Sequence, residues 1–581
     1  LGSVKFLKTL RFGDCLTEPR LQDLPFCIGI NPSEMKDVIQ HMISGYELAP
    51  SQSYFNVYNN QDNQHPYPYK TEAGTLNYLQ IKNLFTALGH NTALFNPSET
   101  FHSIDSTLSN TNGVDVTNIV GSGQSTLGQI IEEKTTSLLG IQSTHKEMVK
   151  INGDETVPLL SASFGSPTAY YTQQKHGNLV SNGPALNLVK NILSGNNQLP
   201  GGVSNQPYQF SGTGLSVHSP INIHVYDANN NHTGPLVNGD FEANIPGSSY
   251  DSLDDAKFIF LPEDGQYIIK FEATNQGSFD FKIRKFENDQ NTATTLYNNI
   301  PIISTSQGQT ILNTGSSEPP ILQIDQQPVN PSATLTGNAN YDETPPVTTV
   351  QLSGTQGINN WFKSDVIVTL NAIDETDGSG VDKTEYTLDN GQTIQTYAQP
   401  FIISLEGITK LKFRAIDKAG NEENPKEQEI KIDKTPPEAA VQFNLTTQNL
   451  EINGNEITPG EVILTDEAGN TTKLTVEPKE KKRKEKLEIR TINYNDGPTI
   501  NLPDNKFEVE FKTDKKSGKL KEFEQKIKIK GEEKINAEYN IKKNITKIEI
   551  KENKEKKQKI EKDGIVLLQL LTNKGQLVTN F

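Results

Sequence analysis

The sequence has few of the residues and patterns from which a metal centre or a membrane anchor is usually recognised. It contains two cysteines, one tryptophan and three methionines in 581 residues. Neither C-x-x-C nor H-E-x-x-H occurs, so the common zinc-binding spacings are absent. The longest late apolar run, residues 565–571, is far shorter than the roughly 20 residues of a membrane-spanning helix. No secretory signal peptide is recognisable.

The composition favours several β-rich domains. A chain of 581 residues is too long for one hydrophobic core, and about three to five domains are expected. Hydrophobic residues make up only 33%, while Asn, Thr, Gly and Pro are abundant, as in turn-rich β modules. The formal net charge of −17 argues against a nucleic-acid-binding protein.

The two cysteines leave two alternatives open. Cys15 and Cys27 lie close enough in sequence to close a small loop. They form a disulfide if the protein matures in an oxidising compartment, and stay as buried thiols otherwise.

One stretch carries the strongest chemical signal. A short strand over residues 148–151 places Asp154 at its carboxyl end, where open α/β sheets carry functional groups. His176 follows in a polar loop before an amphipathic helix at residues 184–193. Alone, Asp154 suits a turn cap and His176 a surface histidine. Together they predict the catalytic acid and base of a Ser-His-Asp hydrolase, in the chain order of the α/β-hydrolases.

The nucleophile of such a triad is missing. No G-x-S-x-G motif occurs anywhere in the sequence. A strand over residues 114–120, a glycine-rich turn and a helix over residues 127–139 imitate the serine elbow. However, Ser122 lacks the preceding glycine, and Ser125 has Leu127 at the position where a small residue must clear the turn. We interpret this turn as a neighbour of the substrate cleft, with the nucleophile outside these residues.

The N-terminal region predicts a helical cap. A short helix is expected within residues 1–10, and apolar spacing predicts further helices over residues 33–44 and 75–88. Polar and aromatic sequence lies between the last two. We interpret residues 14–112 as a cap or lid inserted into an α/β core.

Several segments match one family in order. They are Leu1–Val4 with Phe12–Asp14, Leu48–Ser51 with Tyr54 and Phe55, Asn118–Gly123 with Thr126, Gly153–Pro158, and His176. Over about its first 194 residues the chain resembles the C-terminal half of the lecithin:cholesterol acyltransferase family. The resemblance implies an α/β-hydrolase that cleaves and transfers lipid acyl groups, with Asp154 as triad acid and His176 as base.

Behind residue 196 the sequence predicts β modules. Residues 197–217 and 303–341 have the composition of linkers. Residues 218–302 predict a β-sandwich, with strands at 221–226, 258–261, 266–273 and 277–283. The polar loop 227–234 could hold calcium through its oxygen atoms, and the alternative is an Asx-turn without an ion.

A repeat marks the next modules. Asp342-Glu343-Thr344-Pro345-Pro346 recurs as Asp433-Lys434-Thr435-Pro436-Pro437, and the turn Asp417–Asn421 recurs as Asp466–Asn470. The spacing suits an Ig-like domain over residues 342–434 and a second or partial repeat over 435–478. These segments resemble the Ig-like repeats of bacterial cell-surface proteins. Trp361 is expected in the core, with carbohydrate stacking as the alternative. Residues 479–581 predict a charged, β-rich region.

The predicted fold class is therefore multidomain: a truncated α/β-hydrolase, residues 1–196, followed by β-sandwich and Ig-like modules. The expected function is a lipase or O-acyltransferase acting through an acyl-serine, with a lipid or ester substrate and no cofactor. This chain, lacking the nucleophile, is expected to be inactive alone. The alternative is a non-catalytic cell-surface or glycan-binding protein. A membrane surface or cell-wall glycan is a candidate partner, nucleic acid is not, and the expected location is extracellular or the cell surface.

Overall fold

The protein is represented by a computed structural model. It describes residues 2–580 with the exception of 13–35, 37, 58–66, 104–112, 114, 165–167, 182, 219, 237–240, 263–264, 445, 448, 482–483, 495–499, 502–505, 514–519, 529–532, 541–542, 553–555, 564–568 and 574–575. Cys15 and Cys27 therefore lie outside the described residues.

The chain divides into two compact units. The first comprises Leu1–Thr348, Ala372–Glu385 and Phe413–Lys426, and the second comprises Thr349–Asn371, Tyr386–Lys412 and Glu427–Phe581. The candidate site and the β-sandwich both belong to the first unit.

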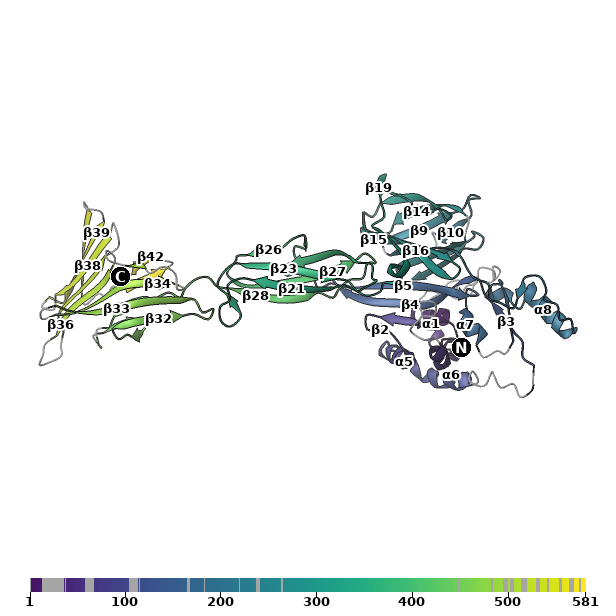
Figure 1. Cartoon of the computed structure of the whole chain (residues 1–581), viewed down its shortest axis with the longest axis horizontal. Coiled ribbons are helices and arrows are strands. Elements are labelled where there is room, and N and C mark those ends of the chain that lie inside the picture. Colours follow the sequence, from purple (N-terminus) through teal and green to yellow (C-terminus); the bar gives the residue numbers. More distant parts are fainter. Residues whose placement is uncertain are drawn as a thin grey trace. The chain divides into compact units, whose positions relative to one another are not determined.

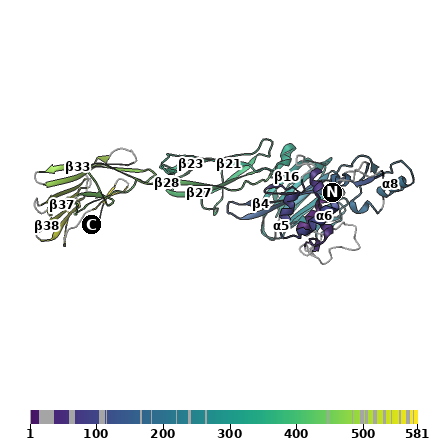
Figure 2. The same ribbon diagram turned by 90° about the horizontal axis from the view of Figure 1, so that it is seen from below.

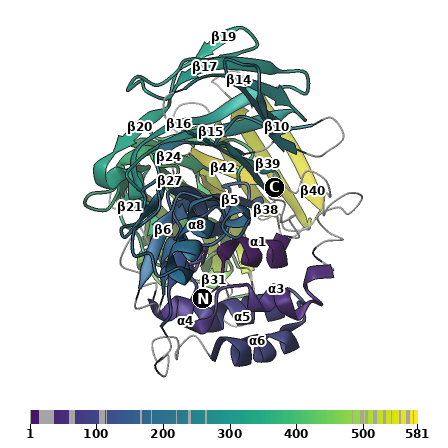
Figure 3. The same cartoon turned by 90° about the vertical axis from the view of Figure 1, so that its right-hand side faces the viewer.

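Helices form the N-terminal part of the first unit. The best defined, α5, begins after Asn77, whose side chain accepts a hydrogen bond from the Gln80 amide while the Gln80 side chain caps Asn77 in return. Its Tyr78, Ile81 and Phe85 are buried on one face, which confirms the helix predicted over residues 75–88. Figure 3 shows these helices gathered together. The helical segments are α1 (Val4–Phe12), α3 (Ile43–Glu47), α4 (Gln52–Val57), α5 (Tyr78–Ala87), η1 (Thr92–Leu94) and α6 (Phe95–His102).

The helix predicted over residues 33–44 lies partly outside the described residues. Within it, Val38 and Ile39 are helical. Met42 has an extended backbone, so the helix does not continue into α3.

A long hairpin replaces one predicted helix. Residues 127–139 were expected to be helical, but they belong mostly to strand β4 (Gln124–Thr136). β4 pairs antiparallel with β5 (Gln142–Gly153) and parallel with β1 (Tyr69–Thr71), which itself pairs with β2 (Gly74–Thr75). The β-branched pairs Ile130–Ile131 and Thr135–Thr136 suit a strand. The apolar spacing of β4 imitates a helix because its first half is buried on both faces.

A small three-stranded sheet contains one parallel pair of strands. Strand β3 (Asn118–Gly121) pairs parallel with β6 (Ala169–Thr172), which pairs antiparallel with β7 (Val203–Ser204). Between β5 and β6 lies the short helix α7 (Leu159–Ser163). After β6 come a 3-10 turn, η3 (His176–Asn178), and helix α8 (Pro184–Leu193). The segment after β6 carries His176, and Asp154 follows the end of β5.

A β-sandwich completes most of the first unit. One sheet has the order β11-β10-β9-β14-β17-β18-β19 and the other β12-β13-β8-β15-β16-β20. Strands β9 and β14 have the bounds that alternation predicted. The strands are β8 (Gly212–His218), β9 (Ile221–Tyr226), β10 (His232–Pro235), β11 (Phe241–Ala243), β12 (Ser249–Leu253), β13 (Ala256–Pro262), β14 (Gln266–Ala273), β15 (Gly277–Glu287), β16 (Gln290–Ile302), β17 (Gln307–Asn313), β18 (Leu322–Ile324), β19 (Gln327–Val329) and β20 (Ala333–Thr336).

The structure differs from the sequence prediction at the edges of this sandwich. Strand β8 lies within the predicted linker 197–217, and β17 to β20 lie within the predicted linker 303–341. Strand β8 resembled a linker because it is rich in Gly, Ser and Thr, although most of its residues are buried. Strands β17 to β20 resembled a linker because most of their outward residues are polar and their inward residues are few. In β17, for example, only Thr310 and Leu312 are buried.

The N-terminal part and the sandwich share a core. Leu253, Ala256 and Phe258 of the sandwich belong to the same buried cluster as α1, α5 and the β4–β5 hairpin. Figure 1 shows α1 and α5 on one side of β4 and β5, with sandwich strands on the other. Two acidic residues link the parts: the half-buried Asp251 pairs with Lys8 and Lys150, and the buried Glu147 pairs with Lys282 and Arg284 of β15. The two parts therefore pack as one body.

The Ig-like region consists of two sheets. One has the order β21-β23-β26 and the other β22-β28-β27-β24-β25. In Figure 2, β21 and β23 form one layer, and β27 and β28 the other. This sandwich-like arrangement confirms the Ig-like prediction. Its strands are β21 (Val347–Ser353), β22 (Trp361–Phe362), β23 (Val366–Ile373), β24 (Val381–Thr387), β25 (Gln395–Thr396), β26 (Phe401–Ile403), β27 (Gly407–Asp417) and β28 (Lys426–Ile432), preceded by η4 (Gly337–Tyr341).

The C-terminal region is also β-structured. The last two strands return to pair with the strand that follows the second Thr-Pro-Pro segment, Ala440 lying opposite Leu571. One sheet has the order β31-β30-β29-β41-β42, and a larger one has the order β32-β33-β34-β36-β37-β38-β39-β40 with β35 beside β34. The predicted division at residue 478 thus falls inside a strand. The strands are β29 (Ala440–Phe443), β30 (Leu450–Ile452), β31 (Asn455–Glu456), β32 (Gly460–Thr465), β33 (Thr471–Lys481), β34 (Lys484–Tyr494), β35 (Ile500–Asn501), β36 (Lys506–Thr513), β37 (Leu520–Lys528), β38 (Glu533–Asn540), β39 (Ile545–Glu552), β40 (Lys556–Asp563), β41 (Gln569–Asn573) and β42 (Gln576–Asn580).

Among the helices that the structure describes, none has the length and apolar character needed to cross a bilayer.

Candidate functional site

Asp154 is held rigidly at the end of β5. Its Oδ1 atom accepts hydrogen bonds from the backbone N–H groups of Thr156 at 3.0 Å and Val157 at 2.6 Å. The tight turn that brings these amides round passes through Glu155, which has a positive φ of 75°. The Asp154 side chain is only 3% exposed. The carboxylate is therefore fixed by the chain itself, with its second oxygen left to face another residue.

That residue is His176. The Nδ1 atom of its imidazole lies 2.9 Å from Oδ2 of Asp154. A second contact joins the backbones, because the His176 N–H donates to the Asp154 carbonyl oxygen at 2.9 Å. The His176 side chain is 48% exposed. The structure thus brings together the two residues that the sequence singled out, one buried and one open to solvent.

The backbone around this pair leaves little space. A Cβ atom added to Gly121 at the end of β3 would lie 2.5 Å from the Cβ of Asp154, so only glycine fits there. The sequence showed Gly121 as part of a glycine-rich turn, but its contact with Asp154 could not be predicted, because the two residues come from different strands.

The loop that carries His176 is fastened to the helix behind it. Gln174 accepts a hydrogen bond from the Ala185 N–H of α8 at 2.9 Å and donates to the Asn178 carbonyl at 3.1 Å. Lys175 forms an ion pair with Glu155 in the acid turn. Neither Gln174 nor Lys175 was predicted as a site residue. The only sequence feature that pointed to these two residues is their position in the polar run before His176.

The two serines of the glycine-rich turn are buried. Ser122 is 0% exposed, and its Oγ accepts a hydrogen bond from the Tyr208 N–H at 3.0 Å. Ser125 is 8% exposed and lies on β4 rather than at the start of a helix. A substrate carbonyl cannot reach a hydroxyl in either position without rearrangement, so neither serine suits the role of nucleophile.

The chemistry open to the Asp154–His176 pair is proton transfer. A carboxylate that accepts from Nδ1 orients the imidazole and stabilises its protonated form, and Nε2 is then the nitrogen that exchanges a proton with a hydroxyl. Half-exposure of the ring gives a substrate access to that nitrogen. The arrangement is an acid–base pair that requires a separate nucleophile.

Two further sequence candidates lie away from the acid–base pair. In the loop after β9, Asp227 accepts hydrogen bonds from the backbone of Asn229 and Asn231, the pattern of an Asx-turn. Trp361 is partly buried on β22 beside the buried Phe362. The hydrogen bonds of Asp227 are thus those of a turn residue.

Comparisons with known proteins give limited information. No family model matches the chain, and no curated protein matches it. Among solved structures, the chain is similar to fibronectin(III)-like modules of Clostridium thermocellum CbhA, with 12% identity over 32% of this chain and 94% of that one and a TM-score of 0.14. It is also similar to domains 4–9 of the surface layer protein SbsC, with 8% identity over 61% of this chain and 95% of that one and a TM-score of 0.12. These TM-scores are too low to establish a shared fold.

Proposed function

We propose that residues 1–196 are the C-terminal part of an α/β-hydrolase that cleaves or transfers lipid acyl groups, with Asp154 as the triad acid and His176 as the base. The observation that carries this proposal is the 2.9 Å contact between Asp154 Oδ2 and His176 Nδ1. The parallel pair of β3 and β6, with His176 in the loop after β6 and α8 behind it, supports it. So does the matching order of acid and histidine along the chain.

The reaction then needs a serine supplied from outside these residues. The serine hydroxyl attacks the ester carbonyl while His176 Nε2 accepts its proton, and the imidazolium returns that proton to the departing alcohol. Water or an acceptor alcohol next loses a proton to His176 and attacks the acyl-serine, which releases the acid or the new ester. Asp154 stabilises the imidazolium in both halves of the reaction.

The test is the activity of a longer chain that includes the sequence encoded upstream of residue 1, in which the proposal requires a G-x-S-x-G segment. We expect hydrolysis of a fatty acyl ester, with His176→Gln lowering kcat/KM by about 10³-fold or more. His41→Gln, which changes an exposed histidine, serves as control and should leave the rate unchanged. Equal rates for the two variants would contradict the assignment, as would the absence of any upstream serine motif.

A second candidate function is a non-catalytic one. The β-sandwich, the Ig-like sheets and the C-terminal sheets together make up most of the described chain, and modules of this kind serve adhesion and display. In this reading the chain binds a cell-wall glycan or a partner surface. Retention of the chain on bacterial cell walls or polysaccharide, with no ester turnover by the longer protein, would favour it. Both readings place the protein outside the cell or on its surface.

A further inference from the structure

Two histidines lie in direct contact on the outer face of the seven-stranded sheet of the sandwich. Nδ1 of His224 on β9 lies 3.0 Å from Nε2 of His232 on β10. They alternate along their strands with the buried residues Ile223, Val225 and Thr233, so their rings point away from the sandwich core. The two side chains are 18% and 12% exposed, and both therefore keep contact with solvent.

Each imidazole has a carboxylate beside its other nitrogen. Nδ1 of His232 lies 2.7 Å from Oε1 of Glu242 on β11, and Nε2 of His224 lies 3.6 Å from Oε2 of Glu272 on β14. A carboxylate only accepts, so Nδ1 of a neutral His232 carries the proton and its Nε2 presents a lone pair to His224. When the His224 proton sits on Nε2, toward Glu272, both facing nitrogens present lone pairs. This is the arrangement of metal-binding histidines, whose outer N–H commonly donates to a carboxylate.

The spacing of the two facing nitrogens suits one metal ion. Two nitrogens bound to a tetrahedral ion at about 2.05 Å lie about 3.3 Å apart, and the distance between those of His224 and His232 is 3.0 Å. A small rotation of either ring supplies the difference. A Cβ atom at Gly234 would lie 2.9 Å from Nε2 of His232 and 3.2 Å from Cα of His224, so the glycine keeps side-chain atoms away from these rings.

The charges around the pair favour a cation. Glu242 and Glu272 bring two negative charges, and Lys270, which lies opposite His224 in the sheet, brings one positive charge. With both rings neutral, the carboxylates are in excess and attract a positive ion. Burial, followed by the charge of His232, lowers the pKa of His224. The neutral imidazole that results at neutral pH is the form that binds metals.

A second group of histidines has the opposite charge balance. His145, His218 and Glu147 also lie close enough together to bind a metal ion. However, Oε2 of Glu147 already lies 2.9 Å from Arg284 and 3.3 Å from Lys282, and these two cations repel a third. The pair on the outer face of the sheet is therefore the better metal site.

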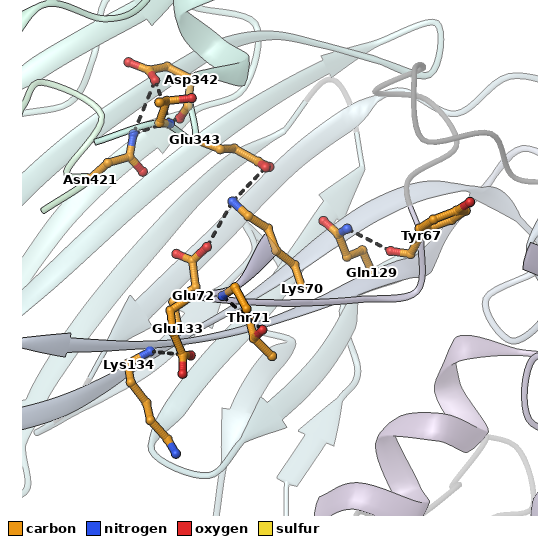
Figure 4. A network of polar contacts seen from close by, with 12 residues as sticks. Tyr67, Lys70, Thr71, Glu72, Gln129, Glu133, Lys134, Asp342, Glu343 and Asn421 are labelled. Atoms are coloured by element: carbon orange, nitrogen blue, oxygen red, sulfur yellow. Dashed lines mark hydrogen bonds and ion pairs between the residues drawn. The ribbon is translucent and has the colours of Figure 1, made fainter. Parts of the chain in front are cut away.

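The carboxylates of a nearby cavity are also occupied by a cation of the chain. This cavity has a volume of about 350 Å³ and is lined in part by Lys70, whose Nζ lies 3.0 Å from Glu133 and 2.8 Å from Glu343. Figure 4 shows Lys70 between the two acidic residues. The lysine thus holds the position between these carboxylates that a metal ion would need.

We propose that His224 and His232 bind one Zn²⁺ ion, His224 through Nδ1 and His232 through Nε2, with water in the remaining positions. Imidazole nitrogens are among the ligands that Zn²⁺ prefers. Glu242 and Glu272 do not touch the ion in this arrangement; they accept from the outer N–H groups and orient the rings. The bound ion joins β9 to β10 near one edge of the sheet, and the site does not depend on the hydrolase activity.

The test is calorimetric titration of the complete chain, prepared without a polyhistidine tag, with Zn²⁺ at neutral pH. We expect saturation at one ion, and an affinity lower by at least about 100-fold in His224→Gln and in His232→Gln, each of which removes a ligand. Glu242→Gln keeps both ligands but weakens the acceptor behind His232, and should raise the Kd by about 10- to 100-fold. His145→Gln, in the second histidine group, is the control and should bind as the wild type does.

Thermal unfolding separates loss of the site from loss of the fold. Melting curves without Zn²⁺ establish that each variant is folded. Addition of Zn²⁺ should raise the Tm of the wild type and of His145→Gln, because an ion that binds only the folded chain stabilises it, and should leave His224→Gln unchanged.

Three outcomes would overturn the proposal. The first is that the wild type shows no saturable binding of Zn²⁺. The second is that folded His224→Gln and His232→Gln bind Zn²⁺ as tightly as the wild type, since this places the ion elsewhere. The third is that binding is lost in His145→Gln and kept in His224→Gln, since this assigns the ion to the second histidine group.

Discussion

Two buried aspartates show how surroundings decide what a carboxylate does. Asp154 is 2% exposed and Asp417 is 1% exposed. Asp154 has a half-exposed imidazole beside one oxygen and backbone amides on the other. Asp417 instead accepts two hydrogen bonds from Asn421, one from its backbone and one from its side chain, both at 2.8 Å. Equal burial therefore accompanies a proton-transfer geometry in one place and a turn in the other.

The hydrogen bonds of the Asp417 turn occur at two places in the chain. The Asn421 side chain also donates to the Asp342 carbonyl at 3.1 Å, which ties the turn to the first Thr-Pro-Pro segment. In the second copy, Asn470 donates to Asp466 and to the Asp433 carbonyl at 2.9 Å. Because the same bonds recur where the sequence repeats, we interpret this aspartate as structural in both copies.

The largest expected effect is on catalytic activity, and it distinguishes Asp154 from Asp417. Asp154→Asn keeps an acceptor for Thr156 and Val157 but turns an amide N–H toward His176, which favours the wrong tautomer. We expect kcat/KM for a fatty acyl ester, measured on the longer chain that carries the serine, to fall by about 10⁴-fold. Asp417→Asn is the matched control and should retain the wild-type rate. Similar losses in both variants would mean that Asp154 acts through stability alone.

The next effect concerns the asparagine hydrogen bonds of these two turns. Asn421→Ala removes both the partner of the Asp417 Oδ2 atom and the bond to the Asp342 carbonyl, and Asn470→Ala removes the equivalent pair in the second copy. Each substitution leaves an acceptor unsatisfied, buried at Asp417 and half-buried at Asp466, and should lower local stability by about 1–3 kcal/mol. Hydrogen exchange of peptides covering the two turns measures this directly. Asn187→Ala, at an exposed asparagine of α8, is the control, and unchanged protection in both turns would contradict the role.

The sequence predicted those features of the site and the fold that depend on residues close together in the chain. Asp154 and His176 stood out because a strand end, a tight turn and a loop before an amphipathic helix can each be recognised within a few residues. The bounds of β9 and β14 followed from strict alternation for the same reason. The repeat boundaries were visible as Thr-Pro-Pro segments.

What the sequence did not predict depends on partners from distant strands. Glu147 showed no signal, because the residues that neutralise it, Lys282 and Arg284, come from the sandwich. β4 was predicted as a helix because two-sided burial removes the alternation of a strand. Strands β17 to β20 resembled a linker because most residues of their exposed faces are polar. In each case the missing information was which segment lies opposite.

A smaller effect is the pH dependence of the stability of the Asp417 turn. Burial, followed by the nearby charges of Asp342 and Asp374, raises the pKa of Asp417 from 3.8 to about 6. Between these values the folded turn holds a proton that the unfolded chain has lost, so stability is greatest at low pH and falls as the pH rises through about 6. Exchange of residues 413–426, corrected for intrinsic rates, should show more opening at pH 7 than at pH 5, by at most about tenfold per pH unit. The dependence should be weaker in Asp417→Asn, and a wild-type turn insensitive to pH would contradict it.

The smallest effect tests whether the acidic neighbours of Asp417 influence the stability of its turn. The carboxylates of Asp342, Asp374 and Glu375 lie within 4.8 Å of one another. Burial, together with hydrogen bonds to Asp374 and Asp342, raises the pKa of Glu375 to about 7. Glu375→Gln removes one of these charges. Because Glu375 is largely exposed and solvent screens it, we expect a gain of about 0.5 kcal/mol or less at pH 8 and none at pH 5, where the wild-type carboxyl is already protonated. Urea-dependent exchange at the two pH values measures the gain. Glu318→Gln, an exposed glutamate outside this cluster, should give none at either pH, and a gain of equal size at pH 5 would show that the effect is not electrostatic.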